Sequence, residues 1–176
     1  MNEVILERTS RQRGSLYSPD SEHDACGVGF IASINGRRSN QVLRFALRSL
    51  CNLAHRGAVD ADAKTGDGAG VSTQIPYKIF APEMKRLGHR LFKDSDLGVG
   101  FLFLPHDNAY AQARAKAITE EVLAKRGLFL FGWRETPLNF HVLGEKAQST
   151  MPRIEQVLVG RPWGMGDEDY ERRLFL

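Results

Sequence analysis

The sequence is poor in cysteine: only Cys26 and Cys51 occur among its 176 residues, and neither belongs to a CxxC pair. A disulfide framework and a cysteine-bound zinc site therefore have little support, and a reducing cytoplasm is the expected compartment. The sequence also contains no run that approaches the roughly 18 apolar residues needed to span a membrane, so we expect no membrane partner.

Dense clusters of basic residues are absent as well. The net charge is +3, but the lysines and arginines are scattered, with at most pairs such as Arg37 and Arg38. Nucleic-acid binding is typical of a basic patch or stripe, so we expect no nucleic-acid partner. Hydrophobic residues at 42% and charged residues at 26% predict a folded domain without indicating a function.

The first 25 residues contain no apolar segment of the kind found in secretion signals. They are polar and lack periodicity, and their acidic residues argue against an organellar transit peptide. We expect residues 1–25 to be a leader and a folded body to begin at Cys26. A chain of 176 residues is expected to form one core, or part of a larger one.

The first elements of the body are predicted as strand, turn and helix. The apolar run 27–33 predicts a buried strand, which the Asn-Gly pair at 35–36 closes with a tight turn. Ser39 is expected to cap a helix with apolar residues at helical spacing, and Gly57 is expected to stop it. Cys51 lies near that apolar stripe, where a cysteine is usually a small buried hydrophobe.

Strands and helices continue to alternate along the rest of the chain. The patterns predict strands at 71–75, 99–104, 128–131 and 154–159, helices at 79–87 and 108–126, and the start of another element at 168–175. Asp107 is the expected cap of the longer helix, and Gly127 its stop. This alternation favours a layered α/β or α+β domain.

Two glycine-rich segments partly match nucleotide-binding loops. Gly27, Gly29 and Ala32 fit the dinucleotide fingerprint, but they open a strand, whereas the fingerprint closes one and begins a helix. The loop 66–70 lacks the Gly-Lys-Ser/Thr of a P-loop. Both segments are more typical of backbone that leaves room for a substrate or forms the wall of a pocket.

Asp60, Asp62 and Gly66 have some of the spacing of a calcium-binding loop. However, Lys64 stands where an acidic or amide ligand belongs, and Val71 stands in place of the bidentate glutamate. We therefore expect no metal site in this segment.

Two side chains remain candidates for catalysis when the residues are taken alone. Cys26 stands between the leader and the first apolar run, with a glycine directly after it. His55 lies beside Arg56 at a predicted helix end, where a histidine often bonds to backbone carbonyls instead. The sequence pattern leaves both the catalytic and the structural roles open.

Five ordered segments carry a resemblance to a known family. They are 24–30 (DACGVGF), 52–58 (NLAHRGA), 65–70 (TGDGAG), 130–137 (LFGWRETP) and 154–158 (IEQVL). In order and spacing they resemble the N-terminal class II glutamine amidotransferase domain of the large, or alpha, subunit of the glutamate synthase family. The resemblance covers almost everything from Ser21 onward.

The resemblance implies an α+β N-terminal nucleophile hydrolase fold, a four-layer αββα sandwich of which residues 26–176 are the N-terminal part, incomplete at the C-terminus. It implies that residues 1–25 are a propeptide whose removal makes Cys26 the first residue and the nucleophile. The residues that it implies around the glutamine site are Gly27, His55, Arg56 and Gly57.

The same resemblance implies glutamine as substrate, with the remainder of the large subunit and, in the bacterial form, a small reductase subunit as partners. FMN and an iron–sulfur cluster are implied for the parent protein, and no cofactor is implied for this segment. The family's oxyanion-hole Asn-Gly pair and substrate anchors come later in the domain, so residues 1–176 alone are expected to be inactive or nearly so. The alternatives are a catalytically inactive remnant kept as a structural or subunit-interaction domain, and a flavin- or nucleotide-binding module.

Overall fold

The computed structural model describes residues 27–54, 57–91 and 93–175. They fall into two compact units, Met1–Gly57 and Ala58–Leu176. No helix within these described ranges combines the length and the apolar character needed to cross a bilayer.

The first unit contains one α-helix, α2, at Asn40–Asn52. The predicted cap is confirmed, because the Ser39 hydroxyl accepts a hydrogen bond from the Val42 backbone nitrogen at 3.4 Å. The predicted turn is confirmed too: Gly36 has a φ of 64°, in the left-handed region that glycine adopts at low cost. The helix ends before the predicted stop at Gly57.

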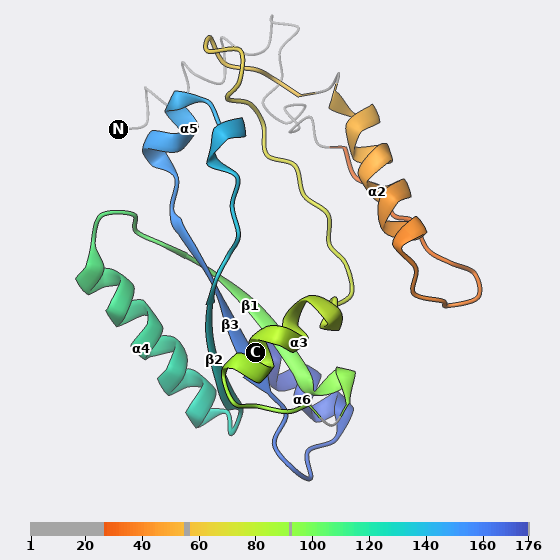
Figure 1. The fold of residues 1–176 in the computed structure, drawn as a ribbon, viewed down its shortest axis with the longest axis vertical. Coiled ribbons are helices and arrows are strands. Elements are labelled where there is room, and N and C mark those ends of the chain that lie inside the picture. Colours follow the sequence, from red (N-terminus) through yellow and green to blue (C-terminus); the bar gives the residue numbers. More distant parts are fainter. Residues whose placement is uncertain (1–26, 55–56, 92, 176) are drawn as a thin grey trace, which may run out of the picture. The chain divides into compact units, whose positions relative to one another are not determined.

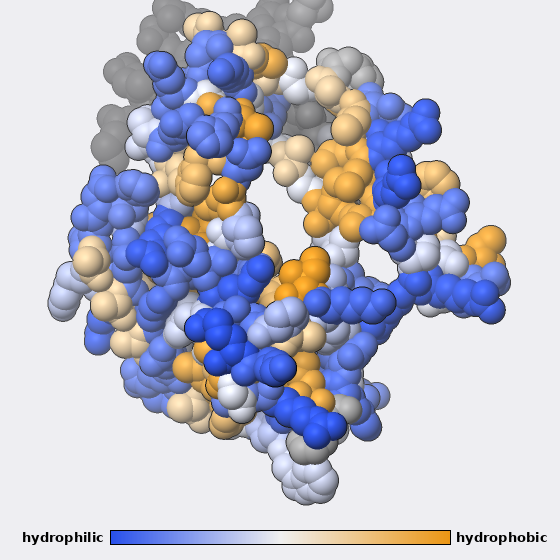
Figure 2. All heavy atoms as spheres, viewed as in Figure 1, coloured by the Kyte–Doolittle hydropathy of each residue, from blue (hydrophilic) through white to orange (hydrophobic). Residues whose placement is uncertain are grey.

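Two predictions for this unit are wrong. The run 27–33 forms no strand, and Val28 and Phe30 are 89% and 94% exposed. A strand exists only when another strand accepts its hydrogen bonds, and no partner lies beside this run among the described residues. Cys51 is exposed instead of buried. No residue of α2 is buried, and Figure 2 shows apolar side chains at the surface of this helix.

The second unit is built on a three-stranded antiparallel sheet. Its strands are β1 (Leu97–Leu104), β2 (Phe129–Glu135) and β3 (Arg153–Gly160), in the order β1-β3-β2. All three overlap predicted strands. The central strand β3 is buried from Glu155 to Gly160, and the second half of the strand contains the apolar run Val157–Val159.

The helices of this unit are α3 (Tyr77–Arg86), α4 (Ala109–Lys125), α5 (Glu145–Thr150) and α6 (Asp167–Phe175), with short 3-10 turns at Asp94–Asp96 and Phe140–Val142. Asn108 caps α4 by accepting from the Ala111 nitrogen at 2.9 Å, so the predicted cap at Asp107 is off by one residue. Gly127, with a φ of 65°, ends α4 as predicted. The predicted strand at 71–75 is wrong, because this segment is unpaired and leads directly into α3.

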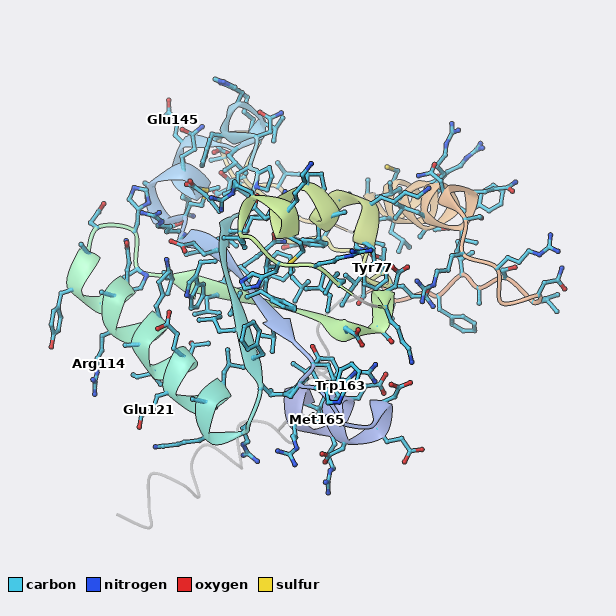
Figure 3. The ribbon with its side chains drawn as sticks, turned by 60° about the horizontal axis from the view of Figure 1, so that its bottom comes forward. Tyr77, Arg114, Glu121, Glu145, Trp163 and Met165 are labelled. Atoms are coloured by element: carbon cyan, nitrogen blue, oxygen red, sulfur yellow. The ribbon has the colours of Figure 1, made fainter. Side chains whose placement is uncertain are left out.

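Helices pack on both faces of the sheet (Figure 1). On one face α3 contributes Phe80 and Met84 to a core with Leu97 and Leu158. A second core, on the other face, contains Leu128, Val157, Val159 and Tyr170, with Leu123 of α4 packed against it. Arg114 and Glu121 point away from the sheet on the outer side of α4 (Figure 3). Helices and an antiparallel sheet agree with the α+β class.

The α3 face of the sheet is covered only in part. Side chains at every second position of β1 share this face. Leu97 is buried there, but Phe101 and Phe103, further along the strand, are 53% and 67% exposed. Two neighbouring exposed phenylalanines on one sheet face form an apolar surface that the described residues cover only in part.

Truncation of Leu158 to alanine should destabilise the sheet strongly. Leu158 is fully buried in the central strand, and a buried leucine replaced with alanine typically costs about 2–5 kcal/mol. The expected result is faster hydrogen exchange of β3 amides in the full-length gene product, equivalent to at least about 2 kcal/mol of lost protection. Leu138→Ala is the matched control, because Leu138 is 37% exposed, and a cost above about 1 kcal/mol there would contradict the argument.

Candidate functional site

The predicted nucleophile and two of the predicted substrate-site residues, Cys26, His55 and Arg56, lie outside the described residues. Gly27 and Gly57 lie within them, and both are exposed. The structure describes the chain segments that flank the predicted residues.

Within the first unit, the residue after Cys26 lies against the end of α2. A Cβ atom on Gly27 would be 3.1 Å from Cδ1 of Leu53, so the backbone at Gly27 touches a side chain two positions before His55. That distance is tighter than an ordinary side-chain contact, so a larger residue at position 27 would displace Leu53. Gly27 therefore lies close to Leu53, just after the end of α2.

Gly57 belongs to a short turn that follows α2. Its backbone nitrogen donates to the Ala54 carbonyl oxygen at 3.2 Å. A Cβ at position 57 would meet that oxygen at 3.5 Å, an ordinary contact. Packing against the described residues therefore does not require glycine at this position.

Directly after Gly57 the chain forms a closed hairpin, residues 58–67. Its base is held by two hydrogen bonds: the Ala58 nitrogen donates to Oδ2 of Asp67 at 2.8 Å, and the Asp67 nitrogen donates to the Ala58 oxygen at 3.2 Å. Above this base Val59 and Gly66 form an isolated β-bridge. The first two residues of the glycine-rich loop 66–70 therefore belong to the hairpin. Residues 68–70 follow it without regular secondary structure.

The tip of the 58–67 hairpin is organised by the Asp62 carboxylate. It accepts hydrogen bonds from the backbone nitrogens of Lys64 and Thr65, at 3.0 and 2.7 Å, and from the Thr65 hydroxyl at 2.5 Å. The Thr65 hydroxyl, together with these backbone donors, holds the pKa of Asp62 below its ordinary value. The carboxylate therefore acts as a structural acceptor.

The hairpin contacts the start of α5, a helix that the sequence patterns did not predict. The Lys146 ammonium lies 2.5 Å from Oδ2 of Asp60, and this bond lowers the pKa of Asp60. Gly144, the residue before α5, faces the tip: a Cβ there would overlap Asp62 and Thr65. Figure 3 labels Glu145, the first residue of α5, which points outward.

The carboxylates that hinted at a calcium loop already have protein partners. Asp62 faces N–H and hydroxyl donors, and Asp60 faces a lysine. A cation would have to displace these donors. Within the described part of the chain, no group of three or more His, Cys, Asp or Glu side chains is arranged to hold a metal ion.

Comparison with known proteins identifies the family. The family model for class II glutamine amidotransferases matches residues 26–176. The chain belongs to the class II glutamine amidotransferases. The match of this amidotransferase begins at Cys26, and it includes the hairpin, the sheet and α5.

This amidotransferase is similar to glutamate synthases. It is 45% identical over 92% of its length to "Glutamate synthase [NADPH] large chain" of Azospirillum brasilense, of which it covers 11%. It is 41% identical over 88% of its length to "Ferredoxin-dependent glutamate synthase 2" of Synechocystis, of which it covers 10%. It is 35% identical over 92% of its length to "Glutamate synthase [NADPH] large chain" of Bacillus subtilis, of which it covers 10%. The chain thus spans about a tenth of the length of these relatives.

The contact between the hairpin and α5 is a feature of the second unit that the sequence patterns did not predict. Lys146 and Asp60 are 86 positions apart, so no local pattern connects them. The only usable indication was Gly144 followed by an acidic residue, which is typical of a helix start but says nothing about a partner.

Proposed function

We propose that this chain forms the N-terminal part of the glutaminase site of a glutamate synthase, with Cys26 as nucleophile, and that residues 1–176 alone are inactive or nearly so. The observation that carries the proposal is the amidotransferase family match, which starts at Cys26 and runs to residue 176. A cysteine at the beginning of the matched domain is what an N-terminal nucleophile requires. We further propose that residues 1–25 are removed, so that Cys26 gains a free α-amino group.

The proposed base is the α-amino group of Cys26 itself. Its pKa of roughly 7.7–8.0 lies near working pH, so it takes the thiol proton of Cys26. The thiolate attacks the side-chain amide carbon of glutamine, and the resulting ammonium returns its proton to the leaving nitrogen, which departs as ammonia. Water, deprotonated by the same amine, then attacks the γ-glutamyl thioester and releases glutamate and the free thiol.

The proposed roles of Gly27, His55, Arg56 and Gly57 are to shape the glutamine site around that thiol. The contact of Gly27 with Leu53, two positions before His55, supports this arrangement. The positive charge of Arg56 is suited to binding a carboxylate. Its guanidinium group can contact the carboxylate through two parallel N–H donors.

The proposed fold is the four-layer αββα sandwich of N-terminal nucleophile hydrolases. The antiparallel sheet, with α4 on one face, supports the proposal because it is compatible with one sheet and one helical layer of that arrangement. The exposed Phe101 and Phe103 offer an apolar surface on which a second sheet can pack.

The ammonia is proposed to serve glutamate synthesis from 2-oxoglutarate elsewhere in the full protein, with FMN and an iron–sulfur cluster. This segment does not fit the cluster, which typically needs four cysteine thiolates where the chain has two cysteines. The remainder of the large subunit and a small reductase subunit are the proposed partners.

An electrophilic glutamine analogue, 6-diazo-5-oxo-norleucine, tests the proposal. Mass spectrometry of the full-length gene product should show loss of residues 1–25 and one label on Cys26, with glutamine protecting it. Cys51 is an internal control, because its exposed thiol should react with iodoacetamide but not with the analogue. An intact leader with an unlabelled Cys26 would favour the inactive structural domain instead.

A further inference from the structure

The pair Asn35-Gly36 is the one place in the sequence where a glycine follows an asparagine. In the structure it ends the turn that begins at Ser33, and the Gly36 backbone nitrogen closes this turn by donating to the Ser33 carbonyl oxygen at 2.9 Å. The turn lies in the segment that leads into α2 (Figure 1) and belongs to no helix or strand. Both residues of the pair are exposed there.

Asparagine is a thermolabile residue, because its side-chain amide can react with the backbone nitrogen of the next residue. At this pair the Gly36 nitrogen would lose its proton to water or hydroxide and attack Cγ of Asn35. The side-chain nitrogen leaves as ammonia, and a cyclic succinimide remains. Water then opens the ring at either carbonyl and gives aspartate or isoaspartate. The overall change is the hydrolysis of one amide, so water is the only other reactant.

The surroundings of Gly36 favour this attack. Gly36 has no Cβ beside the attacking nitrogen, and no atom lies within 4 Å of the position that a Cβ would take. The backbone can therefore rotate toward the Asn35 side chain at low cost. The turn must open first, because the nitrogen that closes it gives up its proton. A hydrogen bond in an exposed turn opens at a small free-energy cost compared with one in a buried strand.

The other asparagines in the described ranges are held in less reactive arrangements. Asn40 and Asn52 are the first and last residues of α2, where helical hydrogen bonding restricts the backbone. Asn108 and Asn139 use their side-chain oxygens to accept from backbone nitrogens two or three positions on, at 2.9 and 3.3 Å. All four precede a residue that has a side chain. Asn35 therefore differs from them in its neighbour and in its setting.

We propose that Asn35 is a site of spontaneous modification, at which the Gly36 nitrogen converts the asparagine into aspartate and isoaspartate. The product has a carboxylate close to the basic pair Arg37 and Arg38, and the net charge of the chain falls by one. In isoaspartate the backbone also runs through the former side chain, which lengthens the turn just before Ser39, the cap of α2. This chemistry is independent of the proposed glutaminase.

The test is peptide mapping of the full-length gene product during incubation at mildly alkaline pH. Mass spectrometry detects the change from amide to acid in each asparagine peptide of one digest, and a zero-time sample corrects for conversion during digestion. We expect Asn35 to convert at least about 10-fold faster than the other asparagines of the described ranges, because its neighbour alone lacks a side chain. The rate should rise with pH, since the attacking nitrogen must lose a proton.

Gly36→Ala tests the role of the glycine. It keeps the asparagine and adds a methyl group beside the attacking nitrogen, so conversion of Asn35 should fall at least about 10-fold. An unchanged rate in this variant, or equal rates at Asn35 and the other asparagines in the wild type, would overturn the proposal.

Ala109→Gly is the matched variant that separates the turn from the dipeptide, and it leaves Gly36 with its φ of 64° unstrained. It places a glycine after Asn108, whose side chain still caps α4. We expect Asn108 in this variant to convert at least about 10-fold more slowly than Asn35, because the helix and the cap restrain both reacting groups. Equal rates would show that the dipeptide alone sets the reactivity and would overturn the role of the exposed turn.

Discussion

Replacement of Cys26 with alanine is expected to lower glutamine hydrolysis by the full-length gene product at least about 1,000-fold. The variant lacks the sulfur atom that we propose forms the thioester, so hydrolysis would require direct attack of water on an unactivated amide. Binding of glutamine should survive, because the substrate-site residues are unchanged. The loss should therefore appear in kcat, with KM or the affinity for glutamine little altered.

Glutamate release from glutamine is the measurement, and Cys51→Ala is its control. Cys51 is the other cysteine of the chain, is exposed, and lies on α2 outside every predicted role, so its removal should leave the rate within about twofold. Cys26→Ser should be far weaker than wild type, since a hydroxyl loses its proton much less readily than a thiol. Retention of a tenth or more of the activity by Cys26→Ala would rule out the proposed nucleophile.

Helices and central strands were predictable because their causes are local. The Ser39 side chain caps α2 through a residue three positions away, and Gly127 ends α4 through its own backbone angle. The apolar run Val157–Val159 of β3 follows from burial of that strand and is visible in the sequence alone. The shift of the α4 cap from Asp107 to Asn108 is small, since both residue types can accept the same hydrogen bond.

The two strands predicted wrongly depend on partners. Runs 27–33 and 71–75 have apolar or alternating residues, yet neither is paired among the described residues. The sequence pattern indicates only which side chains prefer burial. A strand also needs a second strand at hydrogen-bonding distance. Of the candidate site, Gly27 and Gly57 were found by resemblance, whereas the Gly144 contact joins segments about 80 positions apart and left no local pattern.

The proposed free amino group of Cys26 predicts a second large effect. Two versions of the gene can be compared, one beginning with Met before Cys26 and one with Met before Ala25. Removal of the initiator Met leaves a free amine on Cys26 in the first and an amide nitrogen in the second. An amide has no basic lone pair, and general bases are worth about 100- to 10,000-fold. The Ala25 version should lose activity by that factor.

The two versions differ only by one alanine, so a difference in activity can be assigned to the group at the nitrogen of Cys26. The retained terminus is read by mass spectrometry, and glutamate release is measured on each version. The active form should also slow as the pH falls below about 7.7, because protonation of the α-amino group removes the base. A version that retains Ala25 and still hydrolyses glutamine at the full rate would show that another group takes the thiol proton. His55, the neighbour of Arg56, would then become the first candidate for the base.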